Sequence, residues 1–209
     1  MKDCYYCVKG ESEHEIVINK SRFITTLVPV GSAEQAFDEI KRISKKYSDA
    51  THNCYAFISN RENTEQRFSD DGEPQGTAGI PMLEVLKKRN FRMILAVVTR
   101  YFGGIKLGAG GLVSAYSKSV SDALDNADTA RFDYAKFYLV KCDYSDFRKI
   151  SDEIAKTAET VHTEYADSVE IKFACSESEA DRLTEKLTDL SSGKAIITYT
   201  GEGFFGFDK

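Results

Sequence analysis

The sequence contains no apolar run that approaches the length of a membrane-spanning helix, which excludes a helical membrane protein. Its first residues, Met1-Lys2-Asp3, do not begin a secretory signal, so we expect a cytoplasmic protein with no membrane partner. Cysteine is also scarce. The five thiols are odd in number and scattered, which fits reduced side chains better than a disulfide framework. The composition, with 42% hydrophobic residues among 209, is sufficient for the core of one large domain or two small ones.

A strong excess of positive charge is missing as well. The net charge is −5, and residues 1–130 hold 17 of the 28 Lys and Arg residues and 17 of the 33 Asp and Glu residues. This first part is therefore neutral, while residues 131–209 carry the whole negative balance. The distribution argues against a non-specific nucleic-acid binder, and we expect no DNA partner, although a local basic patch remains open.

A second metal-binding motif is the third absence. Cys4 and Cys7 form a C-x-x-C pair, but no further pair and no H-x-x-x-H follows it. A structural zinc site needs four ligands, so the favoured interpretation is an N-terminal strand or arm that carries two thiols. Zinc or redox use of this pair is the alternative. We expect no metal and no cofactor.

A glycine-rich stretch, Arg100–Gly111, stands out among the features that are present. It holds five of the 14 glycines, follows an apolar strand predicted over 93–98, and precedes an amphipathic helix predicted over 112–127. A strand, a glycine loop and a helix N-terminus together are typical of an anion site, because free N–H groups and the helix dipole point at the loop. The candidate binding residues in this stretch are Arg100, Tyr101, Phe102, Gly103, Gly104, Lys106, Gly108, Gly110 and Gly111.

The stretch matches neither of the two best-known phosphate loops. No G-x-x-x-x-G-K-[ST] occurs, and the third glycine of a dinucleotide fingerprint would have to stand at position 113, which is Val113. Close packing of a helix against a sheet is the structural alternative for these glycines, and both roles can hold at once.

An acidic segment lies between residues 67 and 81, where Asp70, Asp71 and Glu73 are accompanied by Thr77. The Gly and Pro content predicts a long ordered loop that leads into a helix over 80–86. These oxygens could hold Mg²⁺, or they could neutralise nearby cations and rigidify the loop; the second hypothesis is favoured. The cations in question are Arg67, Arg100 and Lys106.

His52 lies at the start of a strand predicted over 51–60, on the same face as Cys54 and Ala56. A hydrogen-bonded structural histidine is the favoured role, and acid–base chemistry is the alternative.

The remaining periodicity predicts an α+β protein with two domains, 1–130 and 131–209. The first domain begins with strands over 13–19 and 22–29, followed by a helix that Ser32 caps with Gln35. The second has the order βαββαβ of a ferredoxin-like domain. Its predicted elements cover 135–142, 145–158, 160–165, 169–175, 177–190 and 194–200. We expect the aromatic tail over 201–207 to dock back onto the fold, with partner binding as the alternative.

Four segments resemble motifs of the IMPACT family, and the whole chain resembles its bacterial YigZ branch. The segments are Lys20–Phe23, Ala50–Ala56, Ser69–Pro81 and Thr99–Leu112. The resemblance implies a ribosomal-protein-S5-domain-2-like first domain and a tail similar to the last domain of the translocating elongation factor. Eukaryotic members are translation regulators that carry an extra N-terminal RWD domain, which we do not expect here. Where the family usually has Arg or Lys in the first turn after the loop, this chain has Ser114.

Three functional hypotheses follow. The first is a translation-associated protein that contacts RNA, the ribosome or a translation factor through the glycine loop, with Arg22, Arg67, His52 and Ser114 at its rim. The second is an enzyme acting on a phosphorylated or nucleotide-like small molecule, with His52 or Asp71 as base and Asp70 and Glu73 as metal ligands. The third is a protein-interaction adaptor that uses the acidic second domain. No catalytic residue can be assigned.

Overall fold

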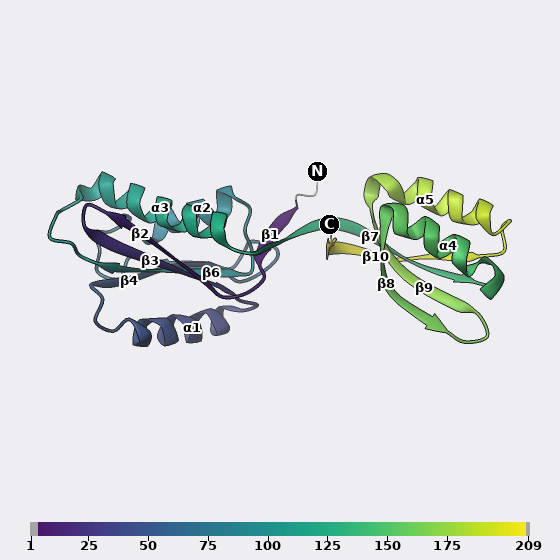
Figure 1. The fold of residues 1–209 in the computed structure, drawn as a ribbon, viewed down its shortest axis with the longest axis horizontal. Coiled ribbons are helices and arrows are strands. Elements are labelled where there is room, and N and C mark those ends of the chain that lie inside the picture. Colours follow the sequence, from purple (N-terminus) through teal and green to yellow (C-terminus); the bar gives the residue numbers. More distant parts are fainter. Residues whose placement is uncertain (1–3, 208–209) are drawn as a thin grey trace. The chain divides into compact units, whose positions relative to one another are not determined.

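The computed structural model describes residues 4–207, which form two compact units of mixed α and β structure (Figure 1). The first unit is Tyr5–Ala130, and the second comprises Cys4 and the described residues from Arg131 onward. The opening Met1-Lys2-Asp3, considered above for a secretory signal, lies outside the described residues. The predicted α+β class is confirmed, and both units are built on antiparallel sheets.

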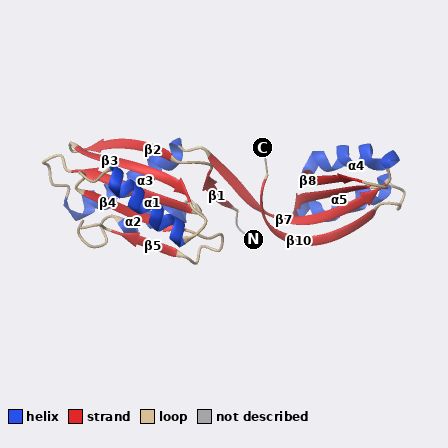
Figure 2. Cartoon of the chain, turned by 90° about the horizontal axis from the view of Figure 1, so that it is seen from below, coloured by secondary structure: helices blue, strands red, loops and turns tan. Residues whose placement is uncertain are grey.

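The first unit contains a five-stranded sheet in the order β2-β3-β6-β4-β5, in which every neighbouring pair is antiparallel (Figure 2). The strands of this unit are β1 (Tyr5–Val8), β2 (Ser12–Ile18), β3 (Ser21–Pro29), β4 (His52–Ile58), β5 (Gln66–Ser69) and β6 (Ile94–Tyr101). Its helices are α1 (Ala33–Lys46), α2 (Gly79–Lys88) and α3 (Gly108–Asn126). Figure 1 shows α1 on one face of the sheet and α2 and α3 on the other. The sheet is therefore buried on both faces.

The central strand β6 shows why the apolar run appears in the sequence. It pairs with β3 on one side and β4 on the other, and all its residues from Ile94 to Arg100 are buried. Alternate side chains face the two cores: Ala96 and Val98 pack with α2 and α3, whereas Leu95 and Val97 pack with α1. A strand with both faces covered has no solvent-facing position, so it reads as continuous rather than alternating.

Local sequence signals account for the ends of α1 and for the turn between β2 and β3. Ser32 caps α1 by accepting the Gln35 backbone N–H at 3.2 Å, and the Gln35 side chain reaches back to Gly31 N at 2.8 Å. Between β2 and β3, Asn19 and Lys20 both have positive φ, 46° and 64°. Two consecutive left-handed residues are what a tight hairpin requires. The glycine loop packs against this turn.

The second unit has a sheet in which β10 pairs with β7, β7 with β9 and β9 with β8, all antiparallel. Its strands are β7 (Thr129–Cys142), β8 (Ala158–Tyr165), β9 (Val169–Ser176) and β10 (Ile196–Gly206). Its helices are α4 (Tyr144–Thr157) and α5 (Glu177–Leu190), which cover one face (Figure 1). The predicted order β-α-β-β-α-β is confirmed.

Several boundaries differ from prediction. The residues expected to open the long loop form the short edge strand β5, which pairs with β4. The expected tail is the second half of β10, where Gly206 pairs with Phe132 and a bulge follows Tyr199. Glycine is depleted in strands, but the aromatic residues of this segment pack on β7: Phe204 contacts Tyr134, and Phe205 contacts Phe137. The tail thus docks as expected, but as strand.

Candidate functional site

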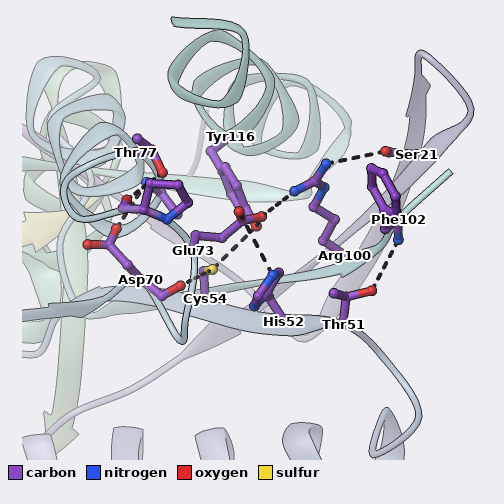
Figure 3. Close-up of polar contacts among 12 residues, drawn as sticks. Ser21, Thr51, His52, Cys54, Asp70, Glu73, Thr77, Arg100, Phe102 and Tyr116 are labelled. Carbon is purple, nitrogen blue, oxygen red and sulfur yellow. Dashed lines mark hydrogen bonds and ion pairs between the residues drawn. The ribbon is translucent and has the colours of Figure 1, made fainter. Parts of the chain in front are cut away.

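A buried ion pair lies where the acidic loop meets the end of β6. The Glu73 carboxylate accepts from Arg100 Nη1 at 2.6 Å and from the Tyr116 hydroxyl at 2.8 Å, and its side chain is 3% exposed. Arg100 also donates to Ser21 Oγ at 3.4 Å. Figure 3 shows Glu73 between side chains of α3, β4 and β6. Of the ion pairs expected for the acidic loop, the one with Arg100 forms, which ties loop, strand and helix together.

The other two carboxylates of the loop are occupied by backbone amides. Asp70 accepts from Gly76 N at 2.8 Å, Ala78 N at 3.0 Å and Gly79 N at 2.8 Å. It thereby takes the place of an N-cap for α2, whose own cap residue makes no side-chain hydrogen bond. Asp71 accepts from Asn53 N at 2.6 Å. Thr77 donates to the Pro74 carbonyl at 2.6 Å.

This arrangement favours the structural role of the loop over a magnesium site. Each carboxylate already serves neutral amides or a guanidinium, and within residues 4–207 no group of three or more His, Cys, Asp and Glu side chains could hold a metal ion. Among the described residues, the enzyme hypothesis therefore lacks an unoccupied carboxylate cluster beside the glycine loop.

The His52 side chain contacts the backbone of the acidic loop. Its Nδ1 lies 2.7 Å from the Asp71 carbonyl oxygen, which can only accept, so Nδ1 carries the proton. Nε2 then faces Glu73 Oε2 at 3.9 Å, which is too long for a hydrogen bond. The imidazole thus fixes the path of the loop, in agreement with a structural role.

A thiol and a phenol complete the buried network. Cys54 Sγ lies 2.9 Å from the Asp70 carbonyl oxygen and 3.3 Å from the Tyr116 hydroxyl. Burial raises the pKa of the Cys54 thiol to about 12 and also raises the pKa of Tyr116, so both groups stay protonated at neutral pH. Tyr116 is consequently a permanent donor to Glu73.

The glycine loop is shorter than predicted, because β6 extends through Tyr101 and α3 begins at Gly108. Gly103 brings it onto the β2–β3 turn: its N–H donates to Ser21 Oγ at 3.2 Å, and an added Cβ would lie 2.0 Å from the Lys20 carbonyl carbon. Phe102 N donates to Thr51 Oγ1 at 3.1 Å. The two anchors hold the loop against two different strand ends.

The other glycines of the stretch have separate roles. Gly104 and Gly108 have φ values of +83° and +70°, which side chains rarely adopt. Gly111 packs against Leu107, 3.1 Å from an added Cβ, whereas Gly110 has no atom within 4 Å. Gly108, Gly110 and Gly111 belong to the first turn of α3 rather than to the loop. Their backbone N–H groups lie at a helix start, where such groups have no partner within the helix.

A pocket of about 290 Å³ opens between the acidic loop, the glycine loop and the start of α3. Its polar and aromatic walls are the ion pair, the ring of Phe102, and Lys106, which has no ion-pair partner within residues 4–207. The lining residues are Glu73, Pro74, Arg100, Phe102, Lys106, Leu107, Gly108, Ala109 and Leu112. Phe102 is 48% exposed, and its ring lies beneath the Arg100 guanidinium, 5.7 Å from the ring centroid.

Nine of the 13 predicted binding residues do not line this pocket, among them four with side chains expected at the rim or on the loop. Arg22, the exposed residue of β3, is paired with Glu15 of β2 at 2.9 Å and stacks over Tyr101. Tyr101 itself donates to Asp49. Arg67 lies exposed on β5 and donates to a backbone carbonyl, and Ser114 is exposed on α3 without lining the pocket. The basic rim expected around the loop is therefore reduced to Lys106 at the pocket.

Sequence reasoning missed the polar role of Tyr116 and the apolar walls Pro74, Leu107 and Ala109. The spacing of Tyr116 from Leu112 and Val120 in the sequence predicts that it faces the core, and a buried hydroxyl needs a hydrogen-bond partner. That requirement was an available signal. The walls carried none, because isolated apolar residues in a loop are common.

Burial also governs one thiol of the C-x-x-C pair, that of Cys7. Cys7 donates to the Arg92 carbonyl at 3.3 Å, and burial raises the pKa of its thiol to about 11. At pH 8 we expect Cys7 to react about a hundredfold more slowly than an unperturbed thiol, because the thiolate is the nucleophile. The difference between a Cys4→Ser variant and the double variant Cys4→Ser with Cys7→Ser, both followed with an aromatic disulfide reagent, isolates this rate from that of the other thiols. Unfolding in guanidinium chloride should restore fast reaction; fast reaction of the native variant would contradict the assignment.

No helix in the described part of the chain is both long and apolar enough to cross a membrane.

Family models match a segment in each of the two units. The Impact N-terminal domain matches residues 19–124, and a domain of unknown function, DUF1949, matches residues 140–194. IMPACT family member YvyE of Bacillus subtilis is 44% identical over 200 residues, which cover 94% of this chain and 91% of that protein. IMPACT family member YigZ of Escherichia coli is 36% identical over 179 residues, with 84% and 88% covered.

More distant relatives match in part. Protein IMPACT of Oryctolagus cuniculus is 38% identical over 97 residues, 44% of this chain and 30% of that protein. A crystal structure of a hypothetical protein aligns over 96% of this chain and 99% of its own, with a TM-score of 0.59 and 31% identity. Bacterial relatives at this identity and coverage, together with the matching family models, show that the chain belongs to the IMPACT family.

Proposed function

We propose that the protein is a translation-related regulatory binding protein that contacts RNA through the glycine loop and the adjoining pocket. The IMPACT family membership supports the regulatory role in general terms. The observation that carries RNA contact is the pairing, in one pocket, of a half-exposed aromatic ring with a cation that has no ion-pair partner among the described residues, Phe102 and Lys106. Single-stranded RNA of any nucleotide sequence has bases that can stack on an aromatic ring and phosphates that attract a cation.

The fold names belong to the same proposal. We assign residues 1–130 to a ribosomal-protein-S5-domain-2-like domain and residues 131–209 to a ferredoxin-like domain similar to the last domain of the translocating elongation factor. The strand order β10-β7-β9-β8 combined with the order β-α-β-β-α-β supports the second assignment. A tandem of this kind is compatible with partners in translation, namely RNA, the ribosome or a translation factor.

Arg100 takes a different place in this proposal from the one its position in the sequence suggested. Its side chain is 7% exposed and its charge is matched by Glu73, so it supports the pocket rather than tracking a phosphate backbone. Lys106 is the exposed cation of the site. Replacement of Lys106 is therefore the decisive test of binding.

Replacement of Lys106 by alanine is expected to weaken binding of a single-stranded oligoribonucleotide about three- to tenfold and to lower the salt slope of the affinity by about one, because one phosphate contact is lost. Fluorescence anisotropy over a salt series measures both. Lys45→Ala is the matched control, since Lys45 is exposed on α1, on the other face of the sheet, and should leave both values unchanged. Equal effects of the two variants would refute contact through the loop.

A further inference from the structure

The pocket beside the glycine loop combines two kinds of wall that a single ligand must satisfy. Pro74, Phe102, Leu107 and Leu112 supply apolar and aromatic surface. Lys106 and the start of α3 supply positive potential, because α3 has no side-chain cap and no acidic residue in its first turn. A free phosphate would leave the apolar walls exposed to water, and an apolar side chain would leave the N–H groups without an acceptor.

One buried polar atom in the wall also lacks a partner in the part of the chain that the structure describes. Arg100 lines the pocket and uses Nη1 and Nη2 on Glu73 and Ser21, but its Nε is buried and has no hydrogen-bond partner among the described residues. A buried donor without a partner is unfavourable, because it has lost its hydrogen bond to water and gained none in exchange. This donor is independent of the helix terminus, and it calls for an acceptor on the ligand.

Phe102 gives the site its flat surface. The Arg100 guanidinium lies over its ring, and about half of the residue remains exposed. Backbone hydrogen bonding of Phe102 to Thr51, and of its neighbour Gly103 to Ser21, fixes the loop that carries the ring. A fixed aromatic plane beside an anion-binding helix start is suited to a planar heterocycle that carries a phosphate.

We infer that the pocket takes one unpaired nucleotide, with its base against Phe102, a base acceptor facing Arg100, and its phosphate at Lys106 and the first turn of α3. The inference rests on the proposed function, because it names what the RNA-contacting surface holds. A free nucleoside monophosphate and an unpaired nucleotide at the 5′ end of an RNA share this chemistry. The volume of about 290 Å³ suits a single small ligand at the lower end of the usual range.

Calorimetric titration of the full chain with the four nucleoside 5′-monophosphates tests the inference. We expect saturable binding of at least one of them, and at least tenfold weaker binding of the corresponding nucleoside and of inorganic phosphate, since each offers only half of the contacts. Phe102→Leu keeps the apolar wall but loses the stacking surface, and should weaken nucleotide binding about tenfold.

A steric variant separates the pocket from its surroundings. Ala109 is exposed in the first turn of α3 and lines the pocket, so Ala109→Trp should fill it and abolish nucleotide binding. Val113→Trp is the matched control, because Val113 is exposed one turn further along α3 and does not line the pocket. Thermal unfolding of both variants verifies the fold. Equal nucleotide binding by Ala109→Trp and the parent would overturn the inference.

Competition with RNA distinguishes the two sources and the two proposals. If a 5′-phosphorylated oligoribonucleotide displaces the nucleotide and its 5′-hydroxyl counterpart does so more weakly, the pocket holds an RNA end. If the nucleotide binds and neither RNA does, the pocket inference stands and the proposed RNA contact fails. If RNA binds while no monophosphate or 5′ end reaches the pocket, the inference fails and the proposed function stands.

Discussion

Replacement of Glu73 by alanine is expected to lower the free energy of unfolding of the first unit by about 3–5 kcal/mol, the range seen when one partner of a buried ion pair is removed. The loss leaves the Arg100 guanidinium with only 7% exposure and without a counter-ion, and it also removes the acceptor of the Tyr116 hydroxyl. Chemical denaturation followed by circular dichroism measures the change. Both partners of the ion pair belong to the first unit, so its unfolding transition is the one to follow.

Two further variants decide whether charge is the cause. Glu84 is an exposed carboxylate on α2 that pairs with Lys87, and Glu84→Ala removes the same charge at a cost of about 0.5 kcal/mol or less. The double replacement Glu73→Leu with Arg100→Met removes both buried charges and should recover a large part of the loss. A single-variant loss below about 1 kcal/mol would show that the pair does not hold the loop.

Replacement of Gly103 by alanine is the second large effect, expected to cost about 3 kcal/mol or more, which is exceptional for the addition of one methyl group. The added Cβ would lie 2.0 Å from the Lys20 carbonyl carbon and 2.4 Å from Ser21 N, both backbone atoms that no rotamer change can move. Either the β2–β3 turn or the glycine loop must shift. The Gly103 N–H to Ser21 hydrogen bond would be lost with it.

Neighbouring glycines supply the controls for this measurement. Gly104 has φ +83° and open space around it, so Gly104→Ala should cost only about 1–2 kcal/mol of backbone strain. Gly110 has neither positive φ nor a nearby atom and lies in α3, so Gly110→Ala should stabilise by about 0.5–1 kcal/mol. The expected order of stability among the three variants is therefore Gly110→Ala, then Gly104→Ala, then Gly103→Ala. A small cost at Gly103 would contradict the close approach.

Much of the fold was predictable, because periodicity is a local property. The helix cap at Ser32, the apolar β6 and the two core faces of β4 all follow from residues within one element. The alternation on β6 also held a clue to the site: a strand that points Ala96 and Val98 toward α2 and α3 must point Arg100 the same way. Extension of the strand by two residues would have placed Arg100 in the interior.

The partition of the acidic loop could not be predicted in the same way. Asp70, Asp71 and Glu73 are close in sequence and chemically alike, yet one caps α2, one anchors β4 and one neutralises Arg100. These roles depend on the path of a loop across three elements distant in the chain. Composition can indicate that such carboxylates will have partners, but long-range packing decides which partner each one takes.

The two backbone anchors of the glycine loop, at Ser21 and Thr51, have a kinetic consequence. A loop that is already fixed before any ligand arrives needs no ordering step. The observed rate of ligand association with the protein should therefore rise linearly with ligand concentration and show no slow isomerisation phase. Differences in affinity between ligands would then arise almost entirely from how fast each one leaves. The preformed loop would therefore distinguish between ligands by the time that each one stays bound.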